Sequence, residues 1–354
     1  MLAACGEQRR GFLGRERATF VGSVQGTSDG LVGHGSMLRS LRAMVVVLSG
    51  GAGGGRFARG VVRAVPASEV TIVCNTADDL DVYGVRVCPD LDLVTFTLAG
   101  LLDRDRGYGL EGDPRTVMEE LRAHGIDTWF DLGDRDFALC VARTRALERG
   151  EPLHQITASI ATRFGLGCRM LPMCDDHVWT AIASDAGTMH FQEYWVRYRA
   201  EVSVHGVGFT GIDATRPAPG VLEAIEAADV ILFAPSNPVV SIGPILAVPG
   251  LREALVAARA PIVAVTPIVG GAVLRGMADR LLRALDVEVS ASGVAGMYAG
   301  LIDGFVLDAR DADLRAQIES LGMRVAVCDT IMADDAITTE LARVALALGE
   351  QVRA

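Results

Sequence analysis

The chain has 354 residues, of which 50% are hydrophobic, and a formal net charge of −11. This length suits one large domain or two modest ones, and the acidic balance argues against general binding to nucleic acid or to a membrane surface. No apolar run reaches the ~18 residues of a membrane span. The seven cysteines form no CxxC pair, which is typical of reduced thiols in a cytoplasmic protein.

The first 43 residues are rich in Gly, Ser and Arg and show no sustained hydrophobic periodicity. We therefore expect residues 1–43 to be a disordered N-terminal extension. Met44 stands directly before the first apolar run. We expect it to be the working start of a domain that covers residues 44–354.

The domain opens with a β-α-β pattern. Residues 45–48 predict a short buried strand, a helix is predicted from about 56 to 65 behind a run of glycines, and residues 70–74 predict a second strand. Both strands are continuous apolar runs, which is typical of parallel strands that are covered on both faces. A right-handed crossover is the default connection for such a unit.

The centre of the chain breaks this rhythm. We predict helices at 90–102, 114–124, 137–148 and 155–164, and short strands at 129–132, 168–172, 178–183 and 189–196. The region of about 105–200 is therefore expected to form a mostly helical insertion or cap over the C-terminal edge of the sheet.

The alternation of strand and helix returns in the last third of the chain. We predict strands at 230–233, 261–265, 304–307 and 325–328, and helices at 221–228, 249–258, 274–285, 312–321 and 335–348. Such alternation indicates an α/β fold, here a Rossmann-like parallel sheet with helices on both faces.

The first candidate motif is "SGGAGGGRF", residues 49–57. We expect Gly51, Gly53, Gly54 and Gly55 to cradle a phosphate, because glycines let the backbone approach a ligand and the following helix N-terminus attracts anions. Arg56 could reach a phosphate oxygen. No Gly-Lys-Ser/Thr follows and no acidic residue ends the second strand, so the motif is neither a Walker loop nor a complete dinucleotide fingerprint. The alternatives are a glycine turn required by packing and a solvated arginine.

The second motif is "CNTADDLDVYG", residues 74–84, at the carboxyl end of the second strand. Open α/β sheets bind ligands at these strand ends. We expect Asn75 and Thr76 to contact substrate, and Asp78 and Asp79 to be candidates for metal ligands and general base, since carboxylates beside a phosphate suit Mg²⁺. The alternative is a solvated turn, which uses the same residue types.

Two later strand ends carry further candidates. In "FAPSNPVVSIGPIL", Ser236, Asn237 and Ser241 can hydrogen-bond a nucleobase or ribose. The alternative is that Ser241 only caps a helix.

In "VTPIVGGAVLRGMAD", Gly270, Gly271 and Arg275 are expected to form a second anion-facing loop. The alternative for this segment is an ordinary helix start with a solvated arginine.

From Met44 onward the chain resembles the 2-phospho-L-lactate transferase family (CofD/FbiA-like) of coenzyme F(420) biosynthesis. The resemblance rests on ordered motifs that span nearly the whole domain. They are the glycine stretch, "NTADD", "LAGLLDRDRGYGLEGD", "WFDLGDRD", "LPMCDD", "FQEYWVR", "APSNPVVSIGPIL" and "PIVGG".

This resemblance implies an activity. The donor would be a guanosine diphosphate derivative that carries a three-carbon acid on its distal phosphate, with phosphoenolpyruvate, 2-phospholactate and phosphoglycerate as the possible acids. The acceptor would be the ribityl hydroxyl of 8-hydroxy-5-deazariboflavin (Fo), and GMP would leave. The resemblance also implies Mg²⁺ as cofactor and a homodimer. Asp78 and Asp79 would be the metal and base candidates, with Asp78 first.

Two positions depart from the family pattern. Ala272 follows "PIVGG" where the family usually has a lysine, which leaves Arg275 to offset charge there, and Cys174 stands where threonine is common. The rival interpretation is a non-catalytic nucleotide-sugar-binding regulator of the gluconeogenesis-factor type, which shares the glycine loop and a similar Ala-Asp-Asp. The "FQEYWVR" and "RGYGLEGD" segments favour the transferase.

Overall fold

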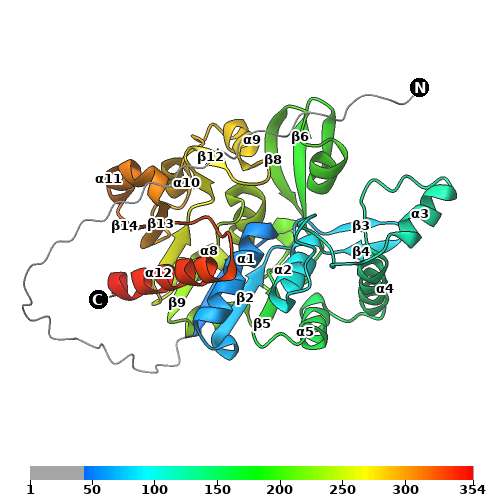
Figure 1. Ribbon diagram of the computed structural model, residues 1–354, viewed down its shortest axis with the longest axis horizontal. Helices are drawn as coiled ribbons and strands as arrows, with labels where there is room; N and C mark the ends of the chain where they lie inside the picture. Colours follow the sequence, from blue (N-terminus) through cyan, green and yellow to red (C-terminus); the bar gives the residue numbers. More distant parts are fainter. Residues whose placement is uncertain (1–43, 354) are drawn as a thin grey trace, which may run out of the picture. The chain divides into compact units, whose positions relative to one another are not determined.

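The computed structural model describes residues 44–353. The extension expected at residues 1–43 lies outside the described residues. Within the described part, the central feature is a seven-stranded parallel sheet in the order β14-β13-β10-β9-β1-β2-β5 (Figure 1). The strands are β1 (Val45–Ser49), β2 (Val70–Cys74), β5 (Arg169–Pro172), β9 (Val230–Phe233), β10 (Ile262–Val265), β13 (Gly304–Asp308) and β14 (Arg324–Cys328).

The strand order explains where a ligand can bind. From β1 the chain proceeds outward through β2 to β5, then returns to the other side of β1 and proceeds through β9, β10 and β13 to β14. The order therefore reverses between β1 and β9, and this topological switch point leaves a crevice at the carboxyl ends of the strands. The Rossmann-like α/β fold expected from the sequence is confirmed.

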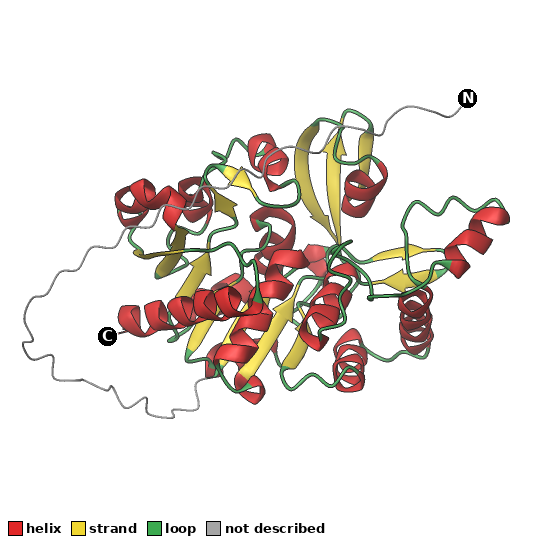
Figure 2. Ribbon diagram, in the orientation of Figure 1, coloured by secondary structure: helices red, strands yellow, loops and turns green. Residues whose placement is uncertain are grey.

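The central strands are apolar throughout because both faces of the sheet are covered. In β1, Val46 and Leu48 belong to one apolar cluster, whereas Val45 and Val47 belong to the other. Helices lie on both sides of the strands in Figure 2. On the Val45 face these are α1 (Gly51–Ala64), α2 (Pro89–Ala99) and α12 (Asp335–Arg353), and on the Val46 face α6 (Val221–Ala227), α7 (Gly243–Ala247), α8 (Leu251–Ala257), α9 (Ala278–Ala284) and α10 (Ala291–Met297).

The central region combines helices with strands. Helices α3 (Thr116–Ala123), α4 (Asp134–Glu148) and α5 (Leu153–Arg163) match the predicted ones within a few residues. This stretch also contributes β5 to the main sheet, and β6 (Trp179–Ser184) and β7 (Gly187–His190) to a small antiparallel sheet that β8 (Val204–Thr210) completes. The insertion is therefore interrupted by a strand of the core sheet.

Of the short strands predicted in this region, that at 129–132 is wrong and that at 189–196 is right only for its first two residues, which belong to β7. Residues 129–132 form an irregular segment, in which the Phe130 backbone N–H donates to the Tyr83 hydroxyl at 2.8 Å instead of to a neighbouring strand. The segment predicted at 189–196 leaves β7 and continues as a π-helical turn, Glu193–Arg197. Apolar and aromatic residues in both segments pack or line a pocket, so their β-like composition reflects burial.

A hairpin that the sequence did not reveal, β3 (Leu80–Val82) with β4 (Val85–Val87), precedes α2.

The C-terminal half contains the predicted strands and helices in the predicted order, together with helix α10, which was not predicted. The 3₁₀ turn Ala309–Leu314 leads into α11 (Arg315–Glu319), and α9 begins four residues later than predicted, at Ala278. The residues before α9 form the hairpin of β11 (Ile268–Val269) and β12 (Ala272–Val273). Gly270 and Gly271 occupy its turn with φ of 60° and 70°, values that glycine adopts readily.

No single helix among residues 44–353 is long and apolar enough to cross a membrane. One pair, Pro238–Ala247 with Leu251–Ala257, passes a test of length and composition together, with an 85° bend between its halves. Residues of this pair such as Val240, Ile245 and Leu255 lie in the core of the domain, which accounts for its apolar composition.

Candidate active site

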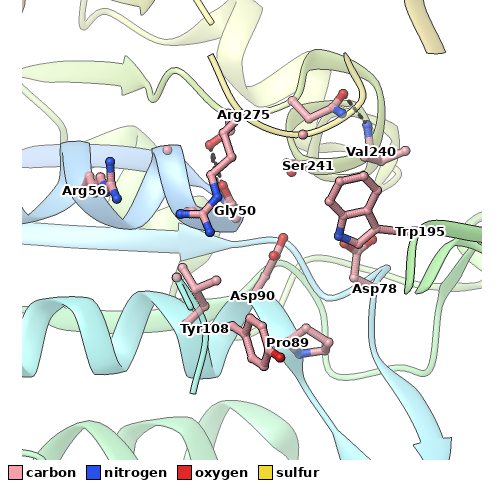
Figure 3. Close-up of a pocket in the computed structure, with 18 of the residues that line it drawn as sticks. Gly50, Arg56, Asp78, Pro89, Asp90, Tyr108, Trp195, Val240, Ser241 and Arg275 are labelled. Carbon is pink, nitrogen blue, oxygen red and sulfur yellow. Dashed lines mark hydrogen bonds between the residues drawn. The ribbon is translucent and has the colours of Figure 1, made fainter. Parts of the chain in front are cut away.

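A pocket of about 990 Å³ opens at the carboxyl ends of β1, β2, β9 and β10. Segments from distant parts of the chain form its wall, as expected at a switch point. Of the residues predicted from sequence, eight line it: Gly51, Gly53, Arg56, Asp78, Ser236, Asn237, Ser241 and Arg275. Figure 3 shows Arg56 at one end of the view, Asp78 and Trp195 at the other, and the Asp90 carboxylate between them.

The turn after β1 is joined to the turn after β9 across the switch point. The Ser236 hydroxyl accepts from the Gly50 backbone N–H at 3.2 Å and donates to the Gly50 carbonyl at 2.7 Å. A Cβ at Gly50 would lie 2.5 Å from an Asp90 oxygen and 2.9 Å from the Ser241 Cβ. Gly50 is therefore required by close approach, although the sequence analysis did not select it.

The glycine stretch is helical rather than a loop before a helix. Helix α1 begins at Gly51 and not at about residue 56 as predicted, so Arg56 lies beyond the first turn of the helix instead of in it. Gly54 and Gly55 are buried and do not line the pocket. A Cβ on Gly54 would meet the Ser49 and Ser236 hydroxyls at 2.4 and 2.5 Å, and one on Gly55 would lie 3.1 Å from Thr97. These two glycines let α1 pack closely against the strand ends and α2.

Asp78 is the predicted carboxylate that faces the pocket. It is 3% exposed, and Oδ2 accepts from the Gln192 side-chain amide at 3.3 Å. Oδ1 is buried without a hydrogen-bond partner among the described residues. Burial, and then the neighbouring Asp90, raise the pKa of Asp78 well above its usual range. Its environment therefore lacks the positive charge that a buried carboxylate requires.

Asp90, at the start of α2, is the second carboxylate of the pocket. It is 5% exposed, and Oδ2 accepts from the Asn75 amide at 2.9 Å. Burial raises the pKa of Asp90 to about 6, opposed by hydrogen bonds from Asn75 and from the Gly51 backbone. Asn75 itself is fully buried and also donates to the Val240 carbonyl at 3.1 Å. Asn75 thus positions Asp90 and does not line the pocket.

Asp79 points to a different part of the molecule from Asp78. It does not line the pocket, and burial raises its pKa to about 8, opposed by a hydrogen bond with Cys88 and by the charge of Arg143. Arg143 is fully buried and pairs with Asp92. Asp136 is adjacent to Asp92. Burial and the charge of Asp92 raise the pKa of Asp136 to about 7. We call these four residues, Asp79, Asp92, Asp136 and Arg143, the interior cluster. Asp92 and Asp136 also reach the pocket wall.

Thr76 is also buried away from the pocket wall, with its hydroxyl 3.7 Å from the Cys174 sulfur.

After β9, Ser236, Asn237 and Ser241 all line the pocket, and the alternative that Ser241 only caps a helix is wrong. The Asn237 side chain accepts from the backbone N–H groups of Val239 and Val240, so Asn237, rather than Ser241, is the helix cap. Ser241 lies inside the π-helical turn Pro238–Ile242 and lines the pocket.

Arginines gather at the end of the pocket nearest to α1. Burial, followed by repulsion from Arg275 and Arg104, lowers the pKa of Arg56. Arg275 also donates to the Arg106 carbonyl at 2.7 Å. Repulsion between the half-buried Arg56 and the exposed Arg275 and Arg104 favours a bound anion. Gly270 and Gly271 do not line the pocket, so they shape the hairpin before Arg275 instead of facing an anion.

Sequence reasoning missed several residues of the pocket wall. The most important are Gly50, Asp90, Tyr108, Gln192 and Trp195. Two of them had a readable signal, because Gly50 directly follows a buried strand and "CPD" places Asp90 at a helix N-terminus behind a proline. Gln192 and Trp195 lie in "FQEYWVR" and Tyr108 lies in "RGYGLEGD", two segments that supported the family resemblance but from which no site residue was predicted.

Comparison with known proteins identifies the relatives of the chain. A family model described as "2-phospho-L-lactate transferase CofD" matches residues 45–344. A phosphoenolpyruvate transferase from Streptomyces griseus subsp. griseus is 48% identical over 88% of this chain and 99% of its own length. Proteins of the same name from Kitasatospora aureofaciens and Mycobacterium sp. (strain KMS) are 49% and 42% identical, covering 87% and 86% of this chain and 98% of each relative.

Solved structures give an independent comparison of the fold. A UPF0052 family protein from Bacillus halodurans superposes with a TM-score of 0.57 over 86% of this chain and 99% of that one. Its sequence is 18% identical, so this likeness concerns the fold alone. The sequence matches are far stronger and favour the transferase over the non-catalytic regulator. The chain therefore belongs to the 2-phospho-L-lactate transferase CofD family and is a transferase.

Proposed function

We propose that the protein transfers a phosphoenolpyruvyl unit from its guanosine diphosphate derivative to the ribityl hydroxyl of Fo, releasing GMP and forming dehydro coenzyme F(420)-0. The observation that carries this proposal is one pocket with a carboxylate pair, Asp78 and Asp90, and an arginine-rich end around Arg56 and Arg275. Phosphoryl transfer depends chiefly on positioning and on charge stabilisation, and this arrangement supplies both.

The carboxylate pair fits a magnesium ion. Asp78 Oδ1 is buried without a partner, and no arginine or lysine among residues 44–353 forms an ion pair with Asp78 or Asp90. Mg²⁺ is held in such sites by one or two carboxylates together with substrate phosphates. Asp78 and Asp90 would hold the ion, which would offset negative charge on the phosphate oxygens when bound. Asp90 rather than Asp79 would be the second ligand, because Asp90 lines the pocket and Asp79 does not.

The remaining residues of the pocket bind and orient the substrates. In the reaction the hydroxyl oxygen bonds to the distal phosphorus, the bond from that phosphorus to the GMP oxygen breaks and leaves its electron pair on GMP, and the hydroxyl releases its proton to solvent water. Arg56 and Arg275 would offset the phosphate charge, while Ser236 and Asn237 hold the guanosine part. Phe96, Tyr108, Phe130 and Trp195 in the pocket wall offer flat surfaces for a heteroaromatic acceptor.

The names of the relatives support phosphoenolpyruvate as the three-carbon acid. All three relatives described above are named phosphoenolpyruvate transferases and cover nearly their whole length. Homodimerisation and a cytoplasmic location stay predictions of the sequence analysis.

Mass spectrometry of the product tests the proposal. The purified protein is incubated with Fo, GTP, Mg²⁺, a partner guanylyltransferase and one of the three phosphoacids. We expect the phosphoenolpyruvate reaction to add that unit to Fo, and the lactyl product to differ from it by two hydrogen atoms. Unmodified Fo with every acid would contradict the transfer, and a preference for 2-phospholactate or phosphoglycerate would contradict the choice of acid.

A further inference from the structure

The small sheet β7-β6-β8 is attached to the turn that carries Asp78. The Thr180 backbone N–H on β6 donates to the Ala77 carbonyl at 2.6 Å. Beyond β7, the Gln192 side-chain amide donates to Asp78 Oδ2 at 3.3 Å. The sheet therefore contacts the backbone of the turn at Ala77, and the segment that follows β7 contacts the carboxylate that faces the pocket.

His190, the last residue of β7, makes a third contact between these parts. Its Nε2 lies 3.1 Å from the Asp79 carbonyl oxygen, and its Nδ1 lies 3.0 Å from the Gln192 backbone nitrogen. The amide can only donate, so Nδ1 must accept and carry no proton. The carbonyl can only accept, so Nε2 must carry the proton. The two partners together select the neutral Nε2–H form, and burial, which lowers the pKa of His190 to about 4, agrees with it.

The ring of His190 is also held in place by packing. It stacks on Trp179 with centroids 5.7 Å apart and an interplanar angle of 21°. A ring fixed by one stacking contact and two hydrogen bonds has little rotational freedom. It therefore fixes the distance between the Asp79 carbonyl and the Gln192 amide, the two backbone groups on either side of the Asp78–Gln192 contact.

We propose that His190 is a positioning residue, which holds the Asp78 carboxylate toward the pocket by joining the Asp79 carbonyl to the Gln192 backbone amide. This proposal rests on the metal-binding role given to Asp78 in the proposed function. Groups that orient a metal ligand typically affect metal affinity 10–100-fold when removed. His190 should thus change metal affinity without contacting either substrate.

The test compares His190→Phe with His190→Asn. Phenylalanine keeps a ring that can stack on Trp179 but removes both hydrogen bonds, whereas asparagine retains an acceptor for the Gln192 amide. His205→Phe is the matched control, since His205 is an exposed histidine of the same small sheet, paired with Asp185. Mn²⁺ binding is measured by calorimetry, and the Mg²⁺ concentration for half-maximal activity and the thermal midpoint are recorded.

We expect His190→Phe to raise the dissociation constant for Mn²⁺ and the half-saturating Mg²⁺ concentration about tenfold or more. His190→Asn should recover part of this affinity, and His205→Phe should match the wild type. Wild-type Mn²⁺ affinity in folded His190→Phe or, if that variant does not fold, in His190→Leu, which also lacks both hydrogen bonds, would overturn the positioning role alone. Absence of Mn²⁺ binding to the wild type would overturn the metal role of Asp78 and this inference together.

Discussion

The pocket pair, Asp78 and Asp90, and the interior cluster both concentrate buried carboxylates within one part of the fold. They differ in their cations. Arg143 pairs with Asp92 inside the cluster, whereas no arginine or lysine of residues 44–353 forms an ion pair with the pocket pair. A buried carboxylate without a counter-charge is costly. The pocket pair therefore suits an added metal ion, and the cluster supplies its own cation.

The interior cluster would otherwise resemble a metal site. Ligand atoms of Asp92, Asp136 and Cys140 lie within 4.8 Å of one another. Arg143 is fully buried beside them and also donates to the Arg86 carbonyl at 3.3 Å. A metal ion there would be repelled by the guanidinium group. Ligand atoms that lie close together therefore indicate a metal site less reliably when a cationic side chain of the protein already lies beside them.

The largest effect is expected for Asp78→Asn. Loss of one metal ligand should lower kcat/KM roughly a thousandfold or more, because a bound metal contributes several kcal/mol to transition-state stabilisation. The thermal midpoint should not fall, since the variant removes a buried carboxylate that lacks a counter-charge. Steady-state kinetics and thermal unfolding measure the two effects, and turnover close to wild type would contradict the assignment.

The next largest effect is expected in the interior cluster. Arg143→Met leaves Asp92 buried without its partner, and breaking a buried pair on one side costs about 3–5 kcal/mol of unfolding free energy. Denaturant unfolding at pH 7 measures this loss. A double variant, Asp92→Asn with Arg143→Met, should recover part of the loss because the unpaired charge is gone. If the single variant lost as little unfolding free energy as a surface substitution does, Arg143 would not offset the negative charge of the interior cluster.

Only some of these features could be predicted from the sequence alone. Strands β1, β2 and β9 and the position of Asp78 at the pocket were readable from the sequence, because an apolar run followed by polar residues indicates the end of a strand at the sheet edge. The partnership of Asp78 with Asp90 was not readable, because the β3–β4 hairpin separates them in sequence and folding brings them together. The start of α1 was misjudged because glycine disfavours helices, whereas close packing against Ser236 and Thr97 requires glycine there.

A smaller effect, visible as a pH dependence, is expected for Asp136→Asn. Burial and then Asp92 raise the pKa of Asp136 to about 7, so between about pH 4 and pH 7 the folded state binds more protons than the unfolded state. This group therefore lowers wild-type stability as pH rises through that window. The variant removes the contribution, so its thermal midpoint relative to wild type should be higher at pH 8 than at pH 4 by about 2 °C or more. If the thermal midpoints of the variant and the wild type differed by the same amount at pH 4 and pH 8, the raised pKa of Asp136 would be contradicted.

The smallest effect is expected for Asp79→Asn, although Asp79 is the sequence neighbour of Asp78. Burial raises the pKa of Asp79 to about 8, so its carboxyl group is mostly protonated in the folded protein at pH 7. Asparagine has nearly the same shape as a protonated aspartic acid and keeps a group that can hydrogen-bond Cys88. We expect kcat/KM to stay within about threefold of wild type and Mn²⁺ affinity to be unchanged, because Asp79 faces the interior cluster rather than the pocket. Kinetics of this variant beside Asp78→Asn make the comparison direct, since the two changes are identical in chemistry and adjacent in sequence. If both variants lost activity equally, the division between the pocket pair and the interior cluster would be wrong, and the two aspartates would have to act on one metal ion.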